Sequence, residues 1–338
     1  MKEKLITHDG YFDHYYFVEP GSDYAEVIWR DIGLLDNATL FPSPLRRSNA
    51  LLQFLHHAHF SFTLGRFVNP PFQRIWTKRY ALSQVMFNED KKYCVIFTDI
   101  SACRTDRRYL EALHRQENIV MVMVMANVVS RKERLLKERF ACFDYVISWD
   151  MSDVEKYHMI YHPPCYSKIG IPDSREPFSD CFFVGNARDR LQILHEIYRR
   201  VTTAGGKAEF YITGVGKKAQ TEAGIHYNQV IPYSSVLAKD LAANCIIEVV
   251  AGGQVGSTLR AEEAIISNKK LLTNNVHMKE SPYYKSGFIR VFTNLCDEDI
   301  DFILKKENVD YGYRDDYSPI LLIDHINALE EERAKRDM

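Results

Sequence analysis

The sequence has no long hydrophobic run and no excess of charge of either sign, and these absences exclude several classes of protein. Its longest apolar stretch, Ile119 to Ala126, is far shorter than the roughly 18 residues that a membrane span needs. The first residues show no apolar segment typical of a signal peptide. The 43 basic and 45 acidic residues give a formal net charge of −2, which argues against a nucleic-acid-binding protein that works by bulk charge. We therefore expect a soluble, cytoplasmic protein, with contact to a membrane surface left open.

Paired cysteines are also missing. The chain has seven cysteines, an odd number, and no CxxC pair. They are Cys94, Cys103, Cys142, Cys165, Cys181, Cys245 and Cys296. Several lie inside apolar runs, so buried free thiols in a reducing compartment are expected rather than a disulfide framework or a zinc site.

Familiar cofactor and metal motifs are absent or unconvincing. There is no GxGxxG dinucleotide fingerprint, no P-loop lysine pattern and no GxSxG nucleophile elbow. The acidic run Asp297 to Asp301 formally matches the DxD of metal-dependent sugar transferases, but it opens a late amphipathic helix, where acids favour the helix dipole. His56, His57 and His59 lack a nearby partner that would complete a metal site. We expect no bound metal and no cofactor.

What the chain does contain is a regular alternation of strands and helices, in two series separated by a proline-rich stretch at 162–177. This pattern predicts two parallel sheets covered by helices on both faces. We expect an N-terminal domain over 1–165, a linker over 166–178 and a second domain over 179–312. A C-terminal helix over 313–338 is a candidate to pack back toward the first domain.

The N-terminal region is rich in aromatic residues and hard to interpret. A strand is considered for Ala25 to Trp29, and the apolar spacing of 48–64 indicates a helix. The segment 66–80 mixes basic and aromatic residues. Contact with an anionic membrane and a core-packed helix with a basic outer face are equally good interpretations of this segment.

A glycine-rich loop in the second series carries the strongest functional signal. The strand Ile246 to Val250 is followed by Gly252, Gly253 and Gly256, then by Ser257 and Thr258, with Ser257 as the expected N-cap of the next helix. Such a turn points main-chain N–H groups and the positive end of a helix at one spot, which suits a phosphate. The alternative is an ordinary turn whose glycines only make the bend.

Other strand ends of the second series strengthen the phosphate interpretation. Gly185 with Arg188 follows one strand, and Gly214 closes another. Arg188, Arg190 and Arg260 are candidates to neutralise a diphosphate. Glu263 shares a helical face with Arg260 and is placed to reach a ribose. Solvated helix charge is the alternative for the arginines.

In the first series, polar residues follow the strands at the edge where active groups of parallel sheets gather. They are Asp99, Asn127 and Asp150. Each is also a plausible helix cap, which is the more common role of such residues.

Several stretches resemble bacterial glycosyltransferases of capsular polysaccharide and O-antigen synthesis. In the second series these are Cys181 to Arg190, Phe210 to Gly214, Ile231 to Tyr233, Gly253 to Ile265 and Lys269 to Asn275. In the first they are Ile96 to Ser101, Asp144 to Asp150 and Tyr161 to Pro163. The resemblance covers most of residues 90–295.

This resemblance implies a GT-B fold, with two Rossmann-like domains whose parallel sheets face each other across a cleft. The second domain would bind a nucleotide-sugar donor and the first a lipid-linked glycan acceptor, without a required metal. Gly256, Ser257 and Thr258 map to the diphosphate site. Glu263, with Glu262 as the fallback, maps to the ribose site, and Ile231 to Tyr233 map to the base contact.

One departure from the family concerns stereochemistry. Many retaining GT-B enzymes carry a further glutamate where this chain has Val255, beside Gln254, which favours an inverting transfer. Inversion needs a general base near the acceptor hydroxyl. Asp99 is the first candidate, with His8, Asp9 and Asp150 as weaker ones. Two rival functions are a nucleotide-sugar 2-epimerase and a non-catalytic nucleotide-sugar-binding module.

Overall fold

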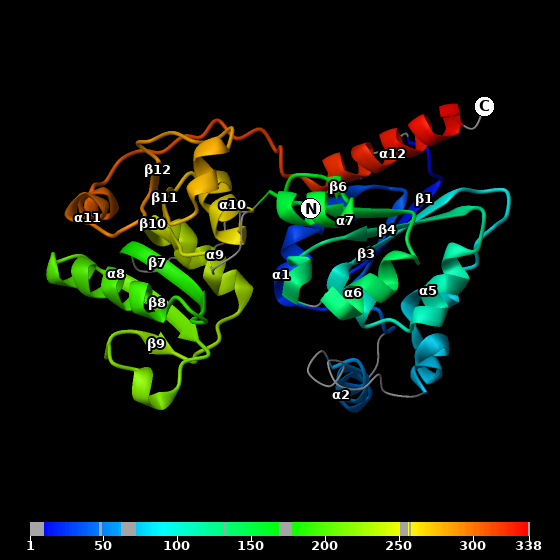
Figure 1. Cartoon of the computed structure of the whole chain (residues 1–338), viewed down its shortest axis with the longest axis horizontal. Helices are drawn as coiled ribbons and strands as arrows, with labels where there is room; N and C mark the ends of the chain where they lie inside the picture. Colours follow the sequence, from blue (N-terminus) through cyan, green and yellow to red (C-terminus); the bar gives the residue numbers. More distant parts are fainter. Residues whose placement is uncertain are drawn as a thin grey trace. The chain divides into compact units, whose positions relative to one another are not determined.

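The computed structural model describes residues 10–46, 49–61, 72–131, 133–168, 178–250, 256 and 258–336. The chain divides into two compact units, each with its own sheet. Unit 1 contains the chain up to Ser167 together with the segment from Tyr317 to the end, and unit 2 runs from Lys168 to Asp316 (Figure 1). The C-terminal helix therefore belongs to unit 1.

Unit 1 is built on a parallel sheet with the strand order β2-β1-β3-β4-β5-β6 within the described residues. Its strands are β1 (His14–Val18), β2 (Ala38–Phe41), β3 (Tyr93–Thr98), β4 (Ile119–Val124), β5 (Tyr145–Ser148) and β6 (Ile160–Tyr161). The central strand β3 is buried along its whole length. A strand covered by helices on both faces must be apolar on both sides, which explains its unbroken hydrophobic run.

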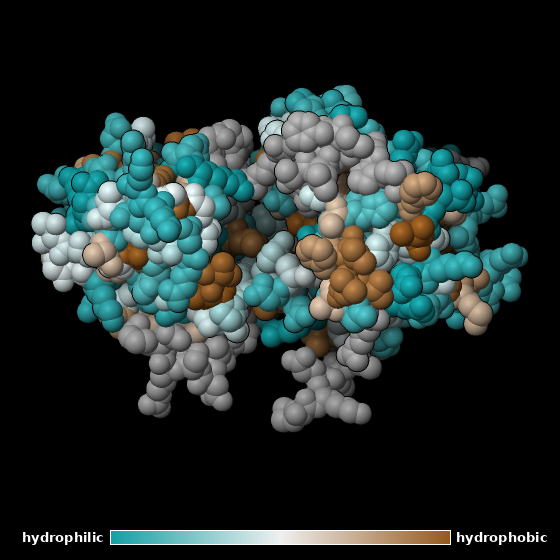
Figure 2. All heavy atoms as spheres, turned by 90° about the horizontal axis from the view of Figure 1, so that it is seen from below, coloured by the Kyte–Doolittle hydropathy of each residue, from teal (hydrophilic) through white to brown (hydrophobic). Residues whose placement is uncertain are grey.

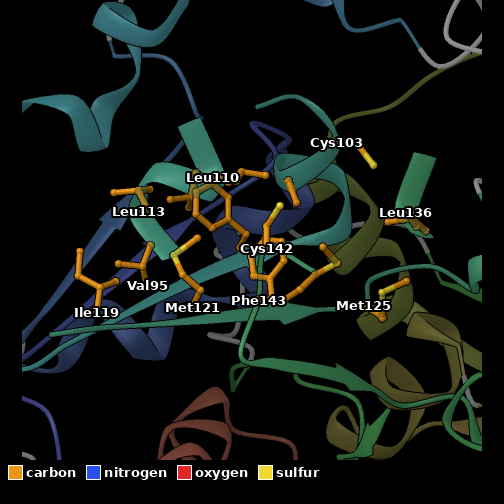
Figure 3. Close-up of a cluster of buried hydrophobic side chains, with 14 of the residues drawn as sticks. Val95, Cys103, Leu110, Leu113, Ile119, Met121, Met125, Leu136, Cys142 and Phe143 are labelled. Carbon is orange, nitrogen blue, oxygen red and sulfur yellow. The ribbon is translucent and has the colours of Figure 1, made fainter. Parts of the chain in front are cut away.

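Helices cover this sheet on both faces (Figure 1). Within the described residues the helices of unit 1 are α1 (Asp23–Ile28), α2 (Ala50–His59), α4 (Asp99–Cys103), α5 (Arg107–His114), α6 (Glu133–Phe140), α7 (Met151–Tyr157) and α12 (Pro319–Arg336), with 3-10 turns η1 (Arg30–Leu34), η2 (Gln73–Arg79), η3 (Ala81–Gln84) and η4 (Val129–Arg131). Of these, α2 lies apart from the sheet and packs against Trp76 of η2 (Figure 1). Figure 3 shows Val95 and Met121 of the sheet packed among Leu110 and Leu113 of α5. Three cysteines of unit 1, Cys94, Cys103 and Cys142, are buried and are not disulfide-bonded.

The N-terminal region differs from two sequence-based expectations. Ala25 to Trp29 was considered as a strand, but residues 23–28 form α1, because Ser22 is extended at its N-cap and Asp23 and Glu26 favour the positive helix end. The helix expected over 48–64 is α2. Its N-cap is Asn49, whose side chain accepts a hydrogen bond from Leu52 N at 2.9 Å. Within the basic segment 66–80, residues 66–71 lie outside the described residues and residues 73–79 form η2.

Unit 2 repeats the architecture with the order β12-β11-β10-β7-β8-β9 within the described residues. Its strands are β7 (Ser179–Asn186), β8 (Ala208–Thr213), β9 (His226–Tyr227), β10 (Ala243–Glu248), β11 (Lys270–Thr273) and β12 (Ile289–Val291), all parallel. Its helices and turns are α8 (Leu191–Thr203), η5 (Lys217–Ala219), α9 (Tyr233–Ala242), α10 (Leu259–Ile266), η6 (Val276–Glu280) and α11 (Asp297–Leu304).

Each sheet has a point where the direction of its strand order reverses. In unit 1 the chain leaves β1 for β2 on one side and returns to β3 on the other side. In unit 2 the corresponding pair is β7 and β10. Open parallel sheets bind ligands beyond the carboxyl ends of the strands at such switch points. The residues that follow β1, β3, β7 and β10 are therefore the first to examine.

Candidate functional site

Arg190 joins the two strand ends at the switch point of unit 2. Its Nε and Nη2 donate to the carbonyl of Asn186, at 3.1 and 2.8 Å, at the end of β7. Its Nη1 donates to the carbonyl of Val249, directly after β10. Gly185 lies under this guanidinium, since a Cβ there would be 3.2 Å from Nη2. A cationic group thus sits at the place where such folds bind their ligand, and the sequence had named it among three candidate arginines.

The other predicted glycine, Gly214, is required by its geometry. Its φ is +74°, and a Cβ there would lie 2.6 Å from the amide nitrogen of Asn186. Arg188 is exposed, also has a positive φ of 45°, and donates its main-chain N–H to the Asn186 side chain at 3.1 Å. The side chain of Asn186, at the end of β7, therefore packs closely against Gly214 after β8, and the sequence did not single out this asparagine.

Only part of the glycine-rich loop lies within the described residues. Residues 251–255 and Ser257 are outside them, while Gly256 and Thr258 are inside. The Nδ2 of Asn275 donates to the Gly256 carbonyl at 3.2 Å. Thr258, and not Ser257 as expected, is the N-cap of α10, because its side chain accepts from Arg260 N at 3.2 Å.

Glu248 is a site residue that sequence reasoning missed. It is the last residue of β10, is buried, and accepts hydrogen bonds from the hydroxyls of Thr258 and, at 2.5 Å, Thr273. Burial raises the pKa of this carboxyl, and the two hydroxyl bonds partly offset that rise. The Thr258 hydroxyl is committed to Glu248, so a phosphate here would be met by main-chain N–H groups and guanidinium groups.

Arg260 and Glu263 form a buried cluster rather than an open pair. Arg260 Nη1 contacts both oxygens of Asp240, at 3.0 and 3.1 Å, and Nη2 pairs with Glu263. The hydroxyl of Tyr233, at the start of α9, donates to the other Glu263 oxygen. Burial raises the pKa of Asp240 well above its usual range, while Arg260 opposes that shift. A ribose hydroxyl could reach Glu263 only by displacing one of these partners.

The remaining predicted donor-side residues lie in or next to α9 and α10. Ile231 is half-buried just before α9, and Tyr233 is buried at the start of that helix. Glu262, the alternative ribose ligand, is also buried.

The acidic run at the start of α11 is part of the helix cap. Asp299 belongs to the capping box of α11 and accepts a hydrogen bond from Arg290 at 2.6 Å, as expected for acidic residues at a helix start. Within the described residues no group of three His, Cys, Asp or Glu side chains could hold a metal.

In unit 1, Asp99 and Asp150 are both tied into the fold. Asp99 is fully buried at the start of α4, and its carboxylate accepts from Ala126 N at 2.9 Å and from Asn127 Nδ2 at 3.4 Å. Asp150 is the N-cap of α7, accepting from Ser152 N at 3.0 Å. His8 and Asp9 lie outside the described residues.

A second carboxylate at the switch point of unit 1 was also missed. Glu19 directly follows β1 and is 1% exposed. Burial, with a smaller contribution from Glu26, raises its pKa to about 7. The sequence could have indicated Glu19 by its position between the strand His14–Val18 and the turn residues Pro20 and Gly21. The strand was not recognised because this stretch is rich in aromatic residues.

The histidines of α2 do not form a metal site. His56 is buried among aromatic rings, and burial lowers its pKa to about 3, so it is neutral. His59 accepts a hydrogen bond from the indole nitrogen of Trp76 at 2.9 Å when its Nδ1 is unprotonated.

No helix in the described part of the chain is long and apolar enough to cross a membrane.

No protein-family model and no curated protein sequence matches the chain. Solved structures do match. A putative UDP-N-acetylglucosamine 2-epimerase from Listeria monocytogenes superposes with a TM-score of 0.53 and 10% identity, over 95% of this chain and 97% of that one. An alpha-glucosyltransferase in complex with UDP-glucose and DNA containing an abasic site superposes with a TM-score of 0.51 and 12% identity, over 86% and 89%.

TarM of S. aureus also matches, with a TM-score of 0.42 and 12% identity over 66% of this chain and 49% of TarM, so this chain spans about half of that protein. Identities this low show the fold alone. The predicted fold class is confirmed: the chain has two Rossmann-like units of the GT-B type, which glycosyltransferases and nucleotide-sugar epimerases share.

Proposed function

We propose that the chain is a glycosyltransferase that moves a sugar from a nucleotide-sugar donor in unit 2 to a glycan acceptor on unit 1. The observation that carries this proposal is the switch point of unit 2. There Arg190 joins the ends of β7 and β10, and α10 opens after a glycine-rich segment. The resemblance to capsule and O-antigen enzymes extends the proposal to a lipid-linked acceptor in bacterial surface polysaccharide synthesis.

The proposed chemistry uses protein groups rather than a metal on the leaving diphosphate. Arg190, the exposed Arg188 and the main-chain N–H groups around Gly256 would stabilise the negative charge as the sugar departs. The positive end of α10 adds to this field. Ile231 and Tyr233 would contact the base, and Glu263 the ribose once Tyr233 or Arg260 has released one of its oxygens. Transfer with inversion is the expected outcome.

The surface around α2 and η2 supports contact with an anionic membrane. Five large apolar side chains are exposed there: Leu51, Phe54 and Leu55 of α2, Phe72 just before η2, and Ile75 of η2. Three exposed cations lie beside them: Arg74, Lys78 and Arg79. Figure 2 views unit 1 from the side on which α2 lies, and hydrophobic side chains gather on it. Apolar anchors flanked by cations suit a bilayer with anionic headgroups.

Vesicle sedimentation tests this membrane contact. Vesicles with anionic phosphatidylglycerol should pull down the chain, and neutral phosphatidylcholine vesicles should not. Phe54→Asp with Phe72→Asp should lower the bound fraction at least about tenfold, because two anchors are lost. Val230→Asp changes an equally exposed apolar residue of unit 2 and should bind as the original chain does. Equal binding by all variants would contradict the assignment.

A panel of UDP-, dTDP- and GDP-linked sugars, offered with and without simple glycoside or polyprenyl-phosphate-sugar acceptors, tests the central proposal. Release of nucleoside diphosphate only when an acceptor is present supports transfer. Tight nucleotide binding with neither release nor conversion would leave the chain a binding module and contradict the proposal.

A nucleotide-sugar 2-epimerase is the second candidate, since one structure of that kind shares the fold over nearly the whole chain. Conversion of a UDP-sugar in the absence of any acceptor, followed by NMR of the sugar ring, would favour this candidate over transfer.

A further inference from the structure

Glu19 is held firmly at the carboxyl end of β1. Its main-chain N–H donates to the carbonyl of Phe41 at 2.8 Å, which pins it to β2. The next carbonyl, of Pro20, accepts from Arg104 at 2.5 Å, and Gly21 turns the chain with a φ of +76°. The side chain therefore leaves a rigid backbone at one side of the unit 1 switch point.

The carboxylate of Glu19 is buried without a partner. The residue is 1% exposed, and neither oxygen accepts a hydrogen bond from any residue that the structure describes. Buried polar groups are nearly always hydrogen-bonded, and burying a carboxylate that lacks a partner is costly. Buried groups with shifted pKa values gather at functional sites, which makes Glu19 a candidate for such a site.

Glu19 is one of the residues that line a pocket of about 420 Å³. The pocket is lined by Glu19, Glu26, Arg30, Gly33, Leu34, Leu40 and Pro42. Its walls combine apolar side chains with two carboxylates and a guanidinium, and its volume lies within the usual range for small-molecule sites, about 300–1,000 Å³. Apolar walls with a few polar groups suit a sugar ring with its hydroxyls.

Glu19 and Asp99 follow neighbouring strands, β1 and β3, but their carboxylates differ in their hydrogen bonds. The Asp99 carboxylate already accepts from the loop after β4, through Ala126 and Asn127. Glu19 lines a pocket, and neither of its oxygens accepts a hydrogen bond from the described residues. A general base needs an oxygen that can reach the acceptor hydroxyl. A Glu19 oxygen could turn toward that hydroxyl without giving up a hydrogen bond to the described residues, whereas Asp99 would have to release one of its donors.

We propose that Glu19 is the catalytic base of unit 1 and that its pocket holds the acceptor hydroxyl, an inference that rests on the proposed transferase function. The hydroxyl oxygen forms a bond to the anomeric carbon of the donor sugar. The bond from that carbon to the diphosphate oxygen breaks, and the nucleoside diphosphate leaves with the electron pair. The hydroxyl proton passes to Glu19, and the sugar is transferred with inversion.

The charges around Glu19 set how its protonation follows pH. Glu26 of α1 opposes its ionisation, as burial does. Arg30 of η1 lines the same pocket, while Arg104 binds the neighbouring carbonyl from the end of α4. Asp99 follows β3 beside β1, and the lining residues of β2 carry no titratable group. The rate of transfer should therefore rise with pH through neutrality, as Glu19 loses its proton.

The test compares three chains in the acceptor-dependent assay. Glu19→Gln keeps the shape and removes the base, so kcat should fall about 10²-fold or more, while the UDP dissociation constant measured by calorimetry stays unchanged. Glu19→Asp keeps a carboxylate but withdraws it, and should lie between. Glu117→Gln, an exposed position before β4, should behave as the original chain. The acid limb of the pH profile should disappear in Glu19→Gln.

The outcomes separate the two proposals. Transfer by the original chain with full activity in Glu19→Gln overturns the role of Glu19 and leaves the transferase function standing. No transfer by the original chain to any acceptor overturns the function and the inference together. An activity-free readout comes from carboxyl-¹³C-glutamate NMR. One resonance, absent in Glu19→Gln, should titrate near neutral pH and should shift when a glycoside is added. If the Glu19 resonance instead titrates near pH 4.5 and does not shift with the glycoside, the inference is also overturned.

Discussion

Arg260 and Glu19 represent two ways in which this chain buries charge. Arg260, with 12% of its side chain exposed, has two fully buried carboxylates as partners, Asp240 and Glu263. Glu19 has none within the described residues. Partnered buried charge fixes a local geometry, whereas unpartnered buried charge reduces stability and is retained where chemistry needs it.

Arg260→Ala should reduce the free energy of unfolding by about 3–5 kcal/mol, because two buried carboxylates lose their counter-charge. Urea denaturation followed by circular dichroism measures the change. Arg107→Ala removes a half-exposed arginine paired with Glu111 and should cost less than about 1 kcal/mol. Equal, small losses in both variants would show that the Arg260 cluster is solvated.

Glu19 makes stability depend on pH in a predictable direction. Its pKa is about 7 when folded, against 4.5 for an ordinary glutamate. Between these values the unfolded chain releases the proton that the folded chain keeps, so stability falls as pH rises, by up to about 3 kcal/mol. Below pH 4.5 both states are protonated and the effect vanishes. Urea midpoints at several pH values should show this fall in the original chain relative to Glu19→Gln; parallel curves would contradict it.

At the level of single elements, Thr258 connects a strand to a helix. Its oxygen caps α10 and its hydroxyl proton goes to Glu248. Thr258→Ala should cost about 1 kcal/mol for the cap and a further 1–3 kcal/mol for the carboxylate left without that donor. Thr258→Ser keeps the hydroxyl and should restore most of the loss in thermal unfolding. An alanine variant as stable as the serine variant would refute the capping role.

The elements that the sequence predicted well are those whose patterns are local. The runs of β3 and β4 are apolar except for Thr98 at the end of β3, because both faces of the sheet are covered, and they could be recognised by that alone. The region of α1 was misjudged as a strand because its apolar residues are few and its helix signals, Ser22 and Asp23, are weak when taken alone.

The site was predictable only in part, for a similar reason. Glycines at strand ends and nearby arginines are visible in one dimension, which is how Gly185, Gly214 and Arg190 were found. Whether a carboxylate is paired or isolated depends on residues far apart in the sequence. Glu248 receives hydroxyls from two other elements and Glu19 receives none from the described residues, and no local pattern records that difference.

At the scale of the whole molecule, the C-terminal helix α12 returns to unit 1 and forms part of its core. Leu322, Ile323 and Ile326 of α12 are fully buried. Asn327 of α12 accepts from the Tyr15 hydroxyl at 2.6 Å, and Glu330 accepts from that of Tyr145 at 2.6 Å. The last residues therefore complete the core around the first strand, while unit 2 has a separate core between α8, α11 and its own sheet.

Separate cores predict that a defect in α12 destabilises one unit and spares the other. Ile326→Ala should lower the stability of unit 1 by about 2–5 kcal/mol through a buried cavity. Leu321→Ala, on the same helix but 41% exposed, should change it little. Hydrogen exchange with peptide-level mass spectrometry should then show faster exchange in β1, β3 and α12, with unit 2 peptides and UDP affinity unchanged. The peptides report the exchange of each unit separately. Faster exchange spread evenly over both units would therefore mean that the chain unfolds as one cooperative body. That result would contradict the division into two independent cores.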